Sequence, residues 1–155
     1  MLPELKKQIE TERSQLHRIL ETHQSLLERC RKAKPTADEL AALAAILHAF
    51  YNGVENIFKR IAVALDGGAP QGEFWHSELI ERMATPSKKR PALLSEAMNE
   101  RLQEYLDFRH VFRHAYTFDL KWSKMKHLVV ECEAVLQTFE KELEMFFIKL
   151  KANEK

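Results

Sequence analysis

The chain has 155 residues and a mass of 18.2 kDa, which suits one domain spanning residues 1–155. Its four glycines and five prolines together fall under half of the roughly 12% that these residues reach in average proteins, which argues against a turn-rich β-sandwich or barrel. Lys and Arg number 24 against 23 Asp and Glu, so bulk charge does not indicate nucleic-acid binding. The composition predicts a helical globular domain.

The cysteine pattern and the hydropathy of the chain bear on its compartment. Cys30 and Cys132 lie far apart in segments expected to be helical, at neither a zinc-site nor a disulfide-framework spacing. The first residues lack the apolar stretch of a signal peptide, and the longest apolar run, residues 40–51, is interrupted by His48. We therefore expect buried thiols in a cytoplasmic protein without a membrane-spanning segment.

Two long helices are expected in the first half of the chain. Residues 3–32 carry apolar side chains at spacings of three, four and seven, which is typical of one helical face. Thr36 and Glu39 match a capping box, and the second helix that they begin runs to the paired glycines at 67–68. Gly53 inside this helix costs about 1 kcal/mol relative to alanine, which favours close packing of another helix there.

The segment 66–91 is less regular, and only residues 74–83 predict a short helix. It holds three of the four glycines and three of the five prolines, so we expect any ligand-facing loop here. The basic residues Lys88 to Arg90 fit either contact with an RNA backbone or a solvated loop. Phe74 and Trp75 fit either stacking on a base or anchoring of the short helix.

Two further long helices complete the expected fold. The third helix begins after Pro91, with Ser95 as a candidate cap, and ends near Tyr116. Thr117 and Asp119 are suitable N-caps for the last helix, which carries a long apolar stripe. Four long helices and one short one predict an all-α bundle.

One stretch differs from the rest because it concentrates side chains that carry chemistry. Residues 107–116 hold two arginines, two histidines and a tyrosine close to the expected helix end, with Arg109, His114 and Tyr116 spaced as R-x4-H-x-Y. This motif resembles the signature of HEPN-domain ribonucleases, in particular HepT-like toxins. The segments YNGVENIFKRIA at 51–62, DGGAPQGEFWH at 66–76 and FRHVFRHAYTFDLKW at 108–122 follow the HepT-like layout, so the resemblance covers most of the chain.

The resemblance implies an antiparallel four-helix HEPN bundle with an additional short helix. It implies a homodimer in which Arg109 and His114 of both subunits face one cleft and cleave RNA, either tRNA or mRNA, without a metal or other cofactor. It also implies the toxin half of a prokaryotic toxin–antitoxin pair. Its antitoxin would be an MNT-type nucleotidyltransferase that inactivates the toxin by AMPylation of Tyr116.

The residue types of the motif suit that chemistry. Metal-free RNA cleavage needs a base for the 2′-hydroxyl proton, an acid for the leaving 5′-oxygen and a fixed positive charge near the phosphate. Histidine exchanges protons near neutral pH, whereas arginine stays charged and presents a planar fork that matches a phosphate. Two copies of His114 would divide the two proton transfers between them.

Helix geometry sets a condition on this site. Arg109 and His114 are five residues apart, which places them about 140° apart around a straight helix. They converge on one phosphate only if the helix unwinds near His114 or a partner subunit completes the site. Arg109 and Tyr116, seven residues apart, share one stripe if the helix persists.

Neighbouring polar residues are candidates for supporting roles. We expect His110 and Arg113 to contact substrate phosphate or the partner subunit. Asn52 and Glu55 are polar positions in an otherwise apolar helix, and the resemblance implies a polar residue there that faces the motif. Glu55 would then orient His114 or Arg109, unless this is simply the solvated face of the helix.

Other interpretations stay open at this stage. Arg109 fits a surface ion pair with Asp107 or Glu104, His114 fits a helix-terminal imidazole stabilised by the dipole, and Tyr116 fits a core-edge position. His110 and His114 have metal-ligand spacing, but no acidic third ligand accompanies them, so we predict no metal site. The alternative functions are a non-catalytic helical subunit that binds a nucleotidyltransferase and a metal or redox bundle.

Overall fold

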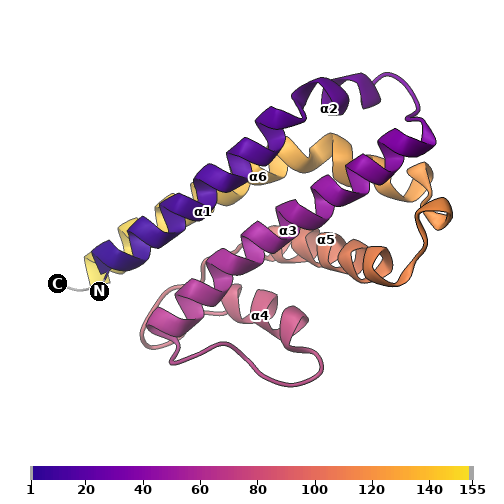
Figure 1. Cartoon of the computed structure of the whole chain (residues 1–155). Helices are drawn as coiled ribbons and strands as arrows, with labels where there is room; N and C mark the ends of the chain where they lie inside the picture. The colour runs from indigo at the N-terminus through magenta and orange to yellow at the C-terminus, as the bar shows by residue number, and fades with distance from the viewer. Residues whose placement is uncertain (1, 154–155) are drawn as a thin grey trace.

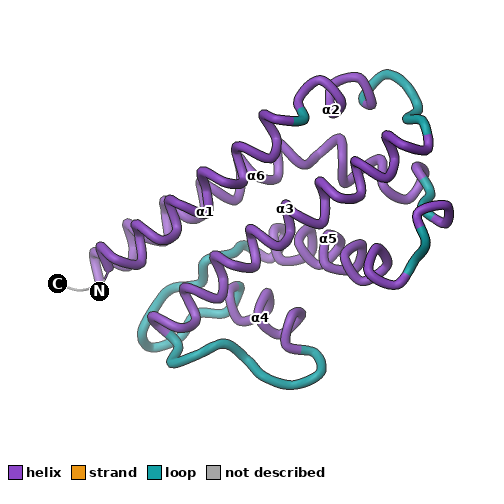
Figure 2. The backbone as a smooth tube through the Cα atoms, viewed as in Figure 1, coloured by secondary structure: helices purple, strands orange, loops and turns teal. Residues whose placement is uncertain are grey.

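The protein folds into six α-helices and one short 3₁₀ turn in this computed structural model, which describes residues 2–153 (Figure 1). The helices are α1 (Leu2–Thr22), α2 (Gln24–Cys30), α3 (Ala37–Leu65), α4 (Trp75–Met83), α5 (Glu96–His114) and α6 (Trp122–Asn153), with the 3₁₀ turn at Thr117–Asp119. Successive long helices run in opposite directions, and α4 packs against α3 and α5 (Figures 1 and 2). The described residues include no strand, so the predicted all-α bundle is confirmed.

Local sequence signals set the starts of two helices. The Thr36 hydroxyl accepts a hydrogen bond from the Glu39 backbone N–H at 3.2 Å, and the Glu39 carboxylate accepts one from the Thr36 N–H at 3.0 Å. The Ser95 hydroxyl accepts from the Met98 N–H at 3.1 Å. Each cap satisfies N–H groups that have no partner inside the helix, so both predicted starts are confirmed.

Two predicted boundaries are wrong. The first helix is interrupted at His23 (φ −109°, ψ 18°), which redirects α2 so that it packs against α6. Thr117 and Asp119 do not cap the last helix, because they lie in the 3₁₀ turn. Leu120 is extended and buried after that turn, and α6 begins only at Trp122.

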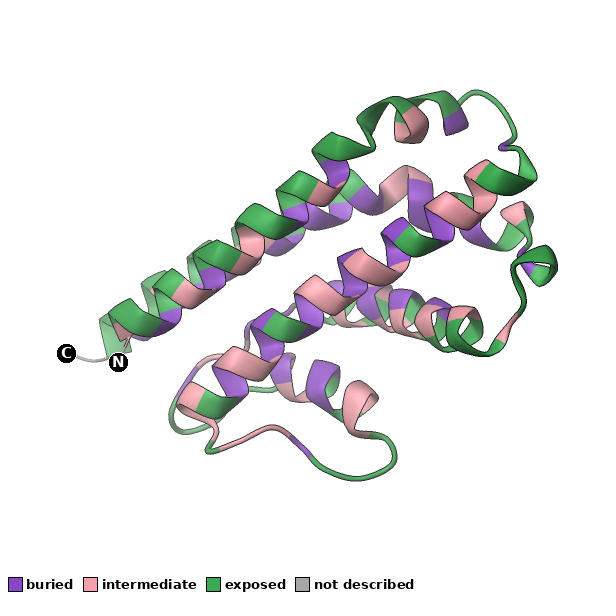
Figure 3. Ribbon diagram, in the orientation of Figure 1, coloured by how far each residue is buried: buried purple, intermediate pink, exposed green. Residues whose placement is uncertain are grey.

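The core lies where the apolar faces of the long helices meet, and these faces point inward in Figure 3. Phe58 of α3 meets Phe139 of α6 edge to face, with ring centroids 5.7 Å apart. The buried Tyr105 hydroxyl donates a hydrogen bond to the Leu128 carbonyl at 2.7 Å. Cys30 and Cys132 are free and buried, as predicted.

Helices α1 and α3 approach each other closely at Gly53. A Cβ atom at Gly53 would lie 2.5 Å from Cδ2 of Leu16, a buried residue of α1. The absence of a side chain at Gly53 therefore lets α1 pack directly on α3, which confirms the predicted close packing.

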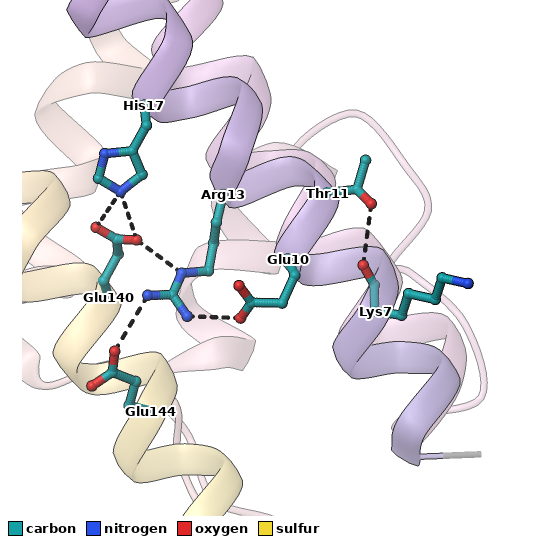
Figure 4. Close-up of polar contacts among 7 residues, drawn as sticks. All are labelled: Lys7, Glu10, Thr11, Arg13, His17, Glu140 and Glu144. Atoms are coloured by element: carbon teal, nitrogen blue, oxygen red, sulfur yellow. Dashed lines mark hydrogen bonds and ion pairs between the residues drawn. The ribbon is translucent and has the colours of Figure 1, made fainter.

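Polar contacts also join α1 to α6 (Figure 4). The Arg13 guanidinium donates to Glu140 at 2.8 Å and to Glu144 at 3.3 Å, and the Nε2 atom of His17 lies 2.8 Å from Glu140. Such partly exposed ion pairs contribute about 0–1 kcal/mol each, so they add to a helix contact that apolar burial already stabilises.

The loop after α3 is held by Arg90. Its side chain is buried and forms a bidentate pair with Asp66, with N–O distances of 2.7 and 3.0 Å. Arg90 is therefore a structural anchor, and neither interpretation of the basic residues 88–90 holds for it. Lys88 and Lys89 remain exposed. Over residues 2–153, none of the helices combines the length and apolarity needed to cross a membrane.

Candidate functional site

The motif lies at the C-terminal end of α5, beside the middle of α3. The helix continues through His114, and Ala115 and Tyr116 are then extended, with ψ angles of 151° and 152°. Arg109 and Tyr116 therefore do not share one face of α5, because the helix ends before Tyr116. The helix also does not unwind between Arg109 and His114, and no hydrogen bond joins these two side chains in the described chain.

Arg109 is half-buried and is held by α3. Its Nε–H donates a hydrogen bond to the Oδ1 atom of Asn52 at 3.1 Å. Among residues 2–153 it forms no ion pair, and Glu104 instead lies near Arg101 and His127. The suggested ion pair with Asp107 or Glu104 is therefore wrong. Both Nη groups have no protein partner within the described chain, so the outer edge of the guanidinium stays available to an anion.

A hydrogen bond connects Asn52 to a residue that the sequence did not single out as functional. The Nδ2 atom of Asn52 lies 3.1 Å from Nε2 of His48, one turn earlier on α3. The His48 ring also packs on Phe112 of α5, with centroids 5.2 Å apart. Burial, followed by the positive charge of Arg109, lowers the pKa of His48. The i, i+4 spacing of His48 and Asn52 is the signal that would have found it.

Glu55 is not the partner of Arg109 or His114 that we expected. Glu55 is 3% exposed, and its carboxylate lies 2.7 Å from Nδ1 of His76 on α4 and 3.8 Å from Nζ of Lys59. The Trp75 ring lies against His76, with ring centroids 3.6 Å apart and planes tilted by 30°, and the ammonium group of Lys59 lies over the Trp75 ring. Because these contacts involve α3 and α4, Glu55 belongs to a separate polar cluster that joins those two helices.

The remaining motif residues face solvent. His110, Arg113 and His114 are exposed on the last turns of α5, and the rings of the two histidines are 4.7 Å apart. Tyr116 is 71% exposed and stacks on Phe118, with the ring planes 4° apart. A core-edge position for Tyr116 is therefore excluded, and its side chain faces solvent.

Most of the chain matches a known protein family. A family model described as HepT-like protein matches residues 42–150, from within α3 to near the end of α6. The chain belongs to the HepT-like family. This HepT-like match includes His48, Asn52 and the whole motif. No curated protein and no solved structure matches the chain.

The site in this HepT-like protein combines an arginine held by a hydrogen bond with two exposed histidines. Arg109 is fixed through its Nε atom, while His110 and His114 lie on exposed positions of the same helix end. Over residues 2–153, the structure contains no group of three or more His, Cys, Asp or Glu side chains placed to hold a metal ion. Family and fold together support a HEPN-type, toxin-like protein.

Proposed function

We propose that this HepT-like protein is a metal-independent RNA endonuclease that acts on tRNA or mRNA as the toxin of a toxin–antitoxin pair. The observation that carries the proposal is the state of Arg109. A half-buried guanidinium is fixed by a neutral amide, and no carboxylate among the described residues neutralises it. A cation held in this way is suited to a phosphate ligand.

The proposed reaction is attack by the RNA's own 2′-oxygen. One imidazole removes the 2′-hydroxyl proton, and the 2′-oxygen then forms a bond to the adjacent phosphorus. The bond from phosphorus to the 5′-oxygen breaks, and a second imidazole protonates that oxygen. The products are a 2′,3′-cyclic phosphate and a 5′-hydroxyl. Arg109 stabilises the charge on the phosphoryl oxygens as it develops.

A homodimer supplies the groups that one chain keeps apart. Because Arg109 and His114 point in different directions from an unbroken helix, we propose that each Arg109 works with His114 of the partner subunit across a shared cleft. Asn52 supports Arg109 in this proposal. The exposed His110 and Arg113 bind substrate phosphate or the second subunit.

AMPylation of Tyr116 is the proposed control of the toxin by an MNT-type nucleotidyltransferase. The phenol oxygen attacks the α-phosphate of ATP, which releases pyrophosphate and leaves AMP on the tyrosine. The exposure of Tyr116 makes the oxygen accessible to this reaction. The added phosphate is negatively charged, so it competes with RNA for the same cations.

Two substitutions test the nuclease proposal. His114→Ala should lower RNA cleavage in the presence of EDTA by about 10²–10⁴-fold, and Arg109→Ala by about 10²–10³-fold. Both variants should lose toxicity and keep the helix content of the original protein by circular dichroism. A fully toxic His114→Ala variant contradicts the proposal. Wild-type behaviour of both variants in growth and cleavage assays would favour the non-catalytic alternative.

Tyr116→Phe tests the control step separately. This variant keeps the aromatic stack with Phe118 but lacks the oxygen that accepts AMP. It should remain toxic when the antitoxin is co-expressed, and intact-mass measurement should show no added AMP. Modification of the Tyr116→Phe protein at another residue contradicts the assignment of Tyr116.

A further inference from the structure

We infer that His48 is a positioning residue of the site: as a neutral imidazole with its proton on Nδ1, it orients the Asn52 amide that holds Arg109. The inference that this arrangement serves catalysis rests on the proposed nuclease function. The protonation state itself follows from the hydrogen bonds alone, so the two statements can be tested separately.

The fixed charge of Arg109 determines the direction of the whole hydrogen-bond chain. A guanidinium is always protonated in proteins, so the Nε–H of Arg109 can only donate. The Asn52 atom at 3.1 Å must therefore be the amide oxygen, which accepts. The other end of that amide, its NH₂ group, then faces His48 and can only donate. At 3.1 Å, Nε2 of His48 must accept, so it carries no proton.

A neutral imidazole has one proton, so the proton of His48 is on Nδ1. Nδ1 is buried and has no hydrogen-bond partner among the described residues. The reverse tautomer would leave a donor on Nε2 facing the NH₂ donor of Asn52. Turning the amide to relieve that contact would place the NH₂ group against the Arg109 donor. Only the Nδ1-protonated form satisfies both hydrogen bonds.

Protonation of His48 to the cation disrupts its hydrogen bond with Asn52. It adds a proton to Nε2, which then opposes the Asn52 NH₂ group. The new charge would also be repelled by the positive charges of Arg109 and Arg113 on α5. The apolar Phe112 ring packs against the imidazole and offers the cation no hydrogen bond. These contacts disfavour the cation, so Arg109 is held in place only while His48 stays neutral.

The protonation state is tested by NMR on the full chain carrying His114→Ala, a substitution that is expected to remove toxicity and that leaves His48, Asn52 and Arg109 unchanged. Long-range ¹H–¹⁵N correlations distinguish the two ring nitrogens of a histidine. His48 should show a protonated Nδ1 and an unprotonated Nε2 at pH 8, and it should keep this form to a lower pH than a free histidine peptide measured in the same buffer. A protonated Nε2 at neutral pH overturns the inference.

The positioning role is tested by cleavage kinetics of two variants in the otherwise unchanged chain. In His48→Gln, the amide oxygen of the new side chain can take the place of Nε2 and accept the hydrogen bond from Asn52, but the amide does not titrate. Its kcat should stay within about threefold of the original at pH 7.5 and should fall less steeply on acidification. In His48→Leu, a side chain of comparable bulk offers no acceptor, so kcat should fall about tenfold or more. His23→Leu is the matched control and should leave kcat unchanged.

The outcomes separate this inference from the proposed function. Equal kcat values for His48→Leu and His48→Gln, at unchanged thermal stability, overturn the positioning role. If His48→Leu unfolds, a His48→Gln profile identical to that of the original protein at every pH overturns the coupling of His48 charge to catalysis. If no form of the protein cleaves RNA, the nuclease proposal fails, and the NMR measurement still decides the protonation state.

Discussion

The anchor at Arg90 leads to the largest effect on stability that we predict. All five N–H donors of the guanidinium are used: two hydrogen bonds go to Asp66, and the others reach the carbonyls of Arg82, Thr85 and Pro91. The side chains of Arg90 and Asp66 are only 1% and 9% exposed. Arg90→Met preserves much of the volume, but it leaves three carbonyls and a nearly buried carboxylate without their partner.

Removing one member of a buried ion pair costs about 3–5 kcal/mol, because the other charge stays behind without compensation. We therefore expect Arg90→Met to lower the free energy of unfolding by about that amount in urea titrations followed by circular dichroism at one fixed protein concentration. Lys89→Met, at the exposed neighbouring position, should change it by less than about 0.5 kcal/mol. Adding Asp66→Asn to Arg90→Met should recover part of the loss. A loss below about 1 kcal/mol for Arg90→Met would refute this account of the loop.

Three further predictions follow from burial and packing. Gly53→Ala places a methyl group 2.5 Å from the buried Leu16 side chain. Alanine favours the helix by about 1 kcal/mol relative to glycine, but the clash outweighs this gain, so the free energy of unfolding should fall by about 1 kcal/mol. A stabilised Gly53→Ala protein in the same urea assay contradicts the packing. The pKa of His48 is lower in the folded protein than in the unfolded chain, so on acidification the unfolded chain binds the proton first. The stability that neutral His48 contributes is therefore complete above about pH 6.5 and is lost as the pH falls. The urea midpoint of unfolding should therefore fall less between pH 7.5 and pH 5 in His48→Gln than in the original protein. An equal fall in both proteins would argue against this linkage. Burial, reinforced by the charge of Glu133, raises the pKa of the Cys132 thiol to about 12, so the thiol stays protonated at neutral pH. Cys132 should react with a thiol reagent only after unfolding in urea, and rapid labelling in the native protein would contradict its burial.

Local signals in the chain are enough to predict most of the helices. The capping box at Thr36 and the cap at Ser95 act within three residues, so their hydrogen bonds depend only on neighbouring backbone. The interruption at His23 has no such local signal, and the short helix that follows it packs against α6. The extended, buried Leu120 likewise depends on its tertiary environment, which is why the predicted start of the last helix is too early.

The sequence by itself determined the helical class, most helix boundaries and membership of the HepT-like family. Only the tertiary structure decided which side chains accompany the R-x4-H-x-Y motif. Arg109 meets Asn52 across 57 residues, Glu55 meets His76 across 21, and Arg90 meets Asp66 across 24. The periodicity of a single helix shows which residues share a face, but the partner of that face depends on how two helices cross. Glu55 and Asn52 are less than one turn apart, and the crossings of α3 with α4 and α5 give them different partners.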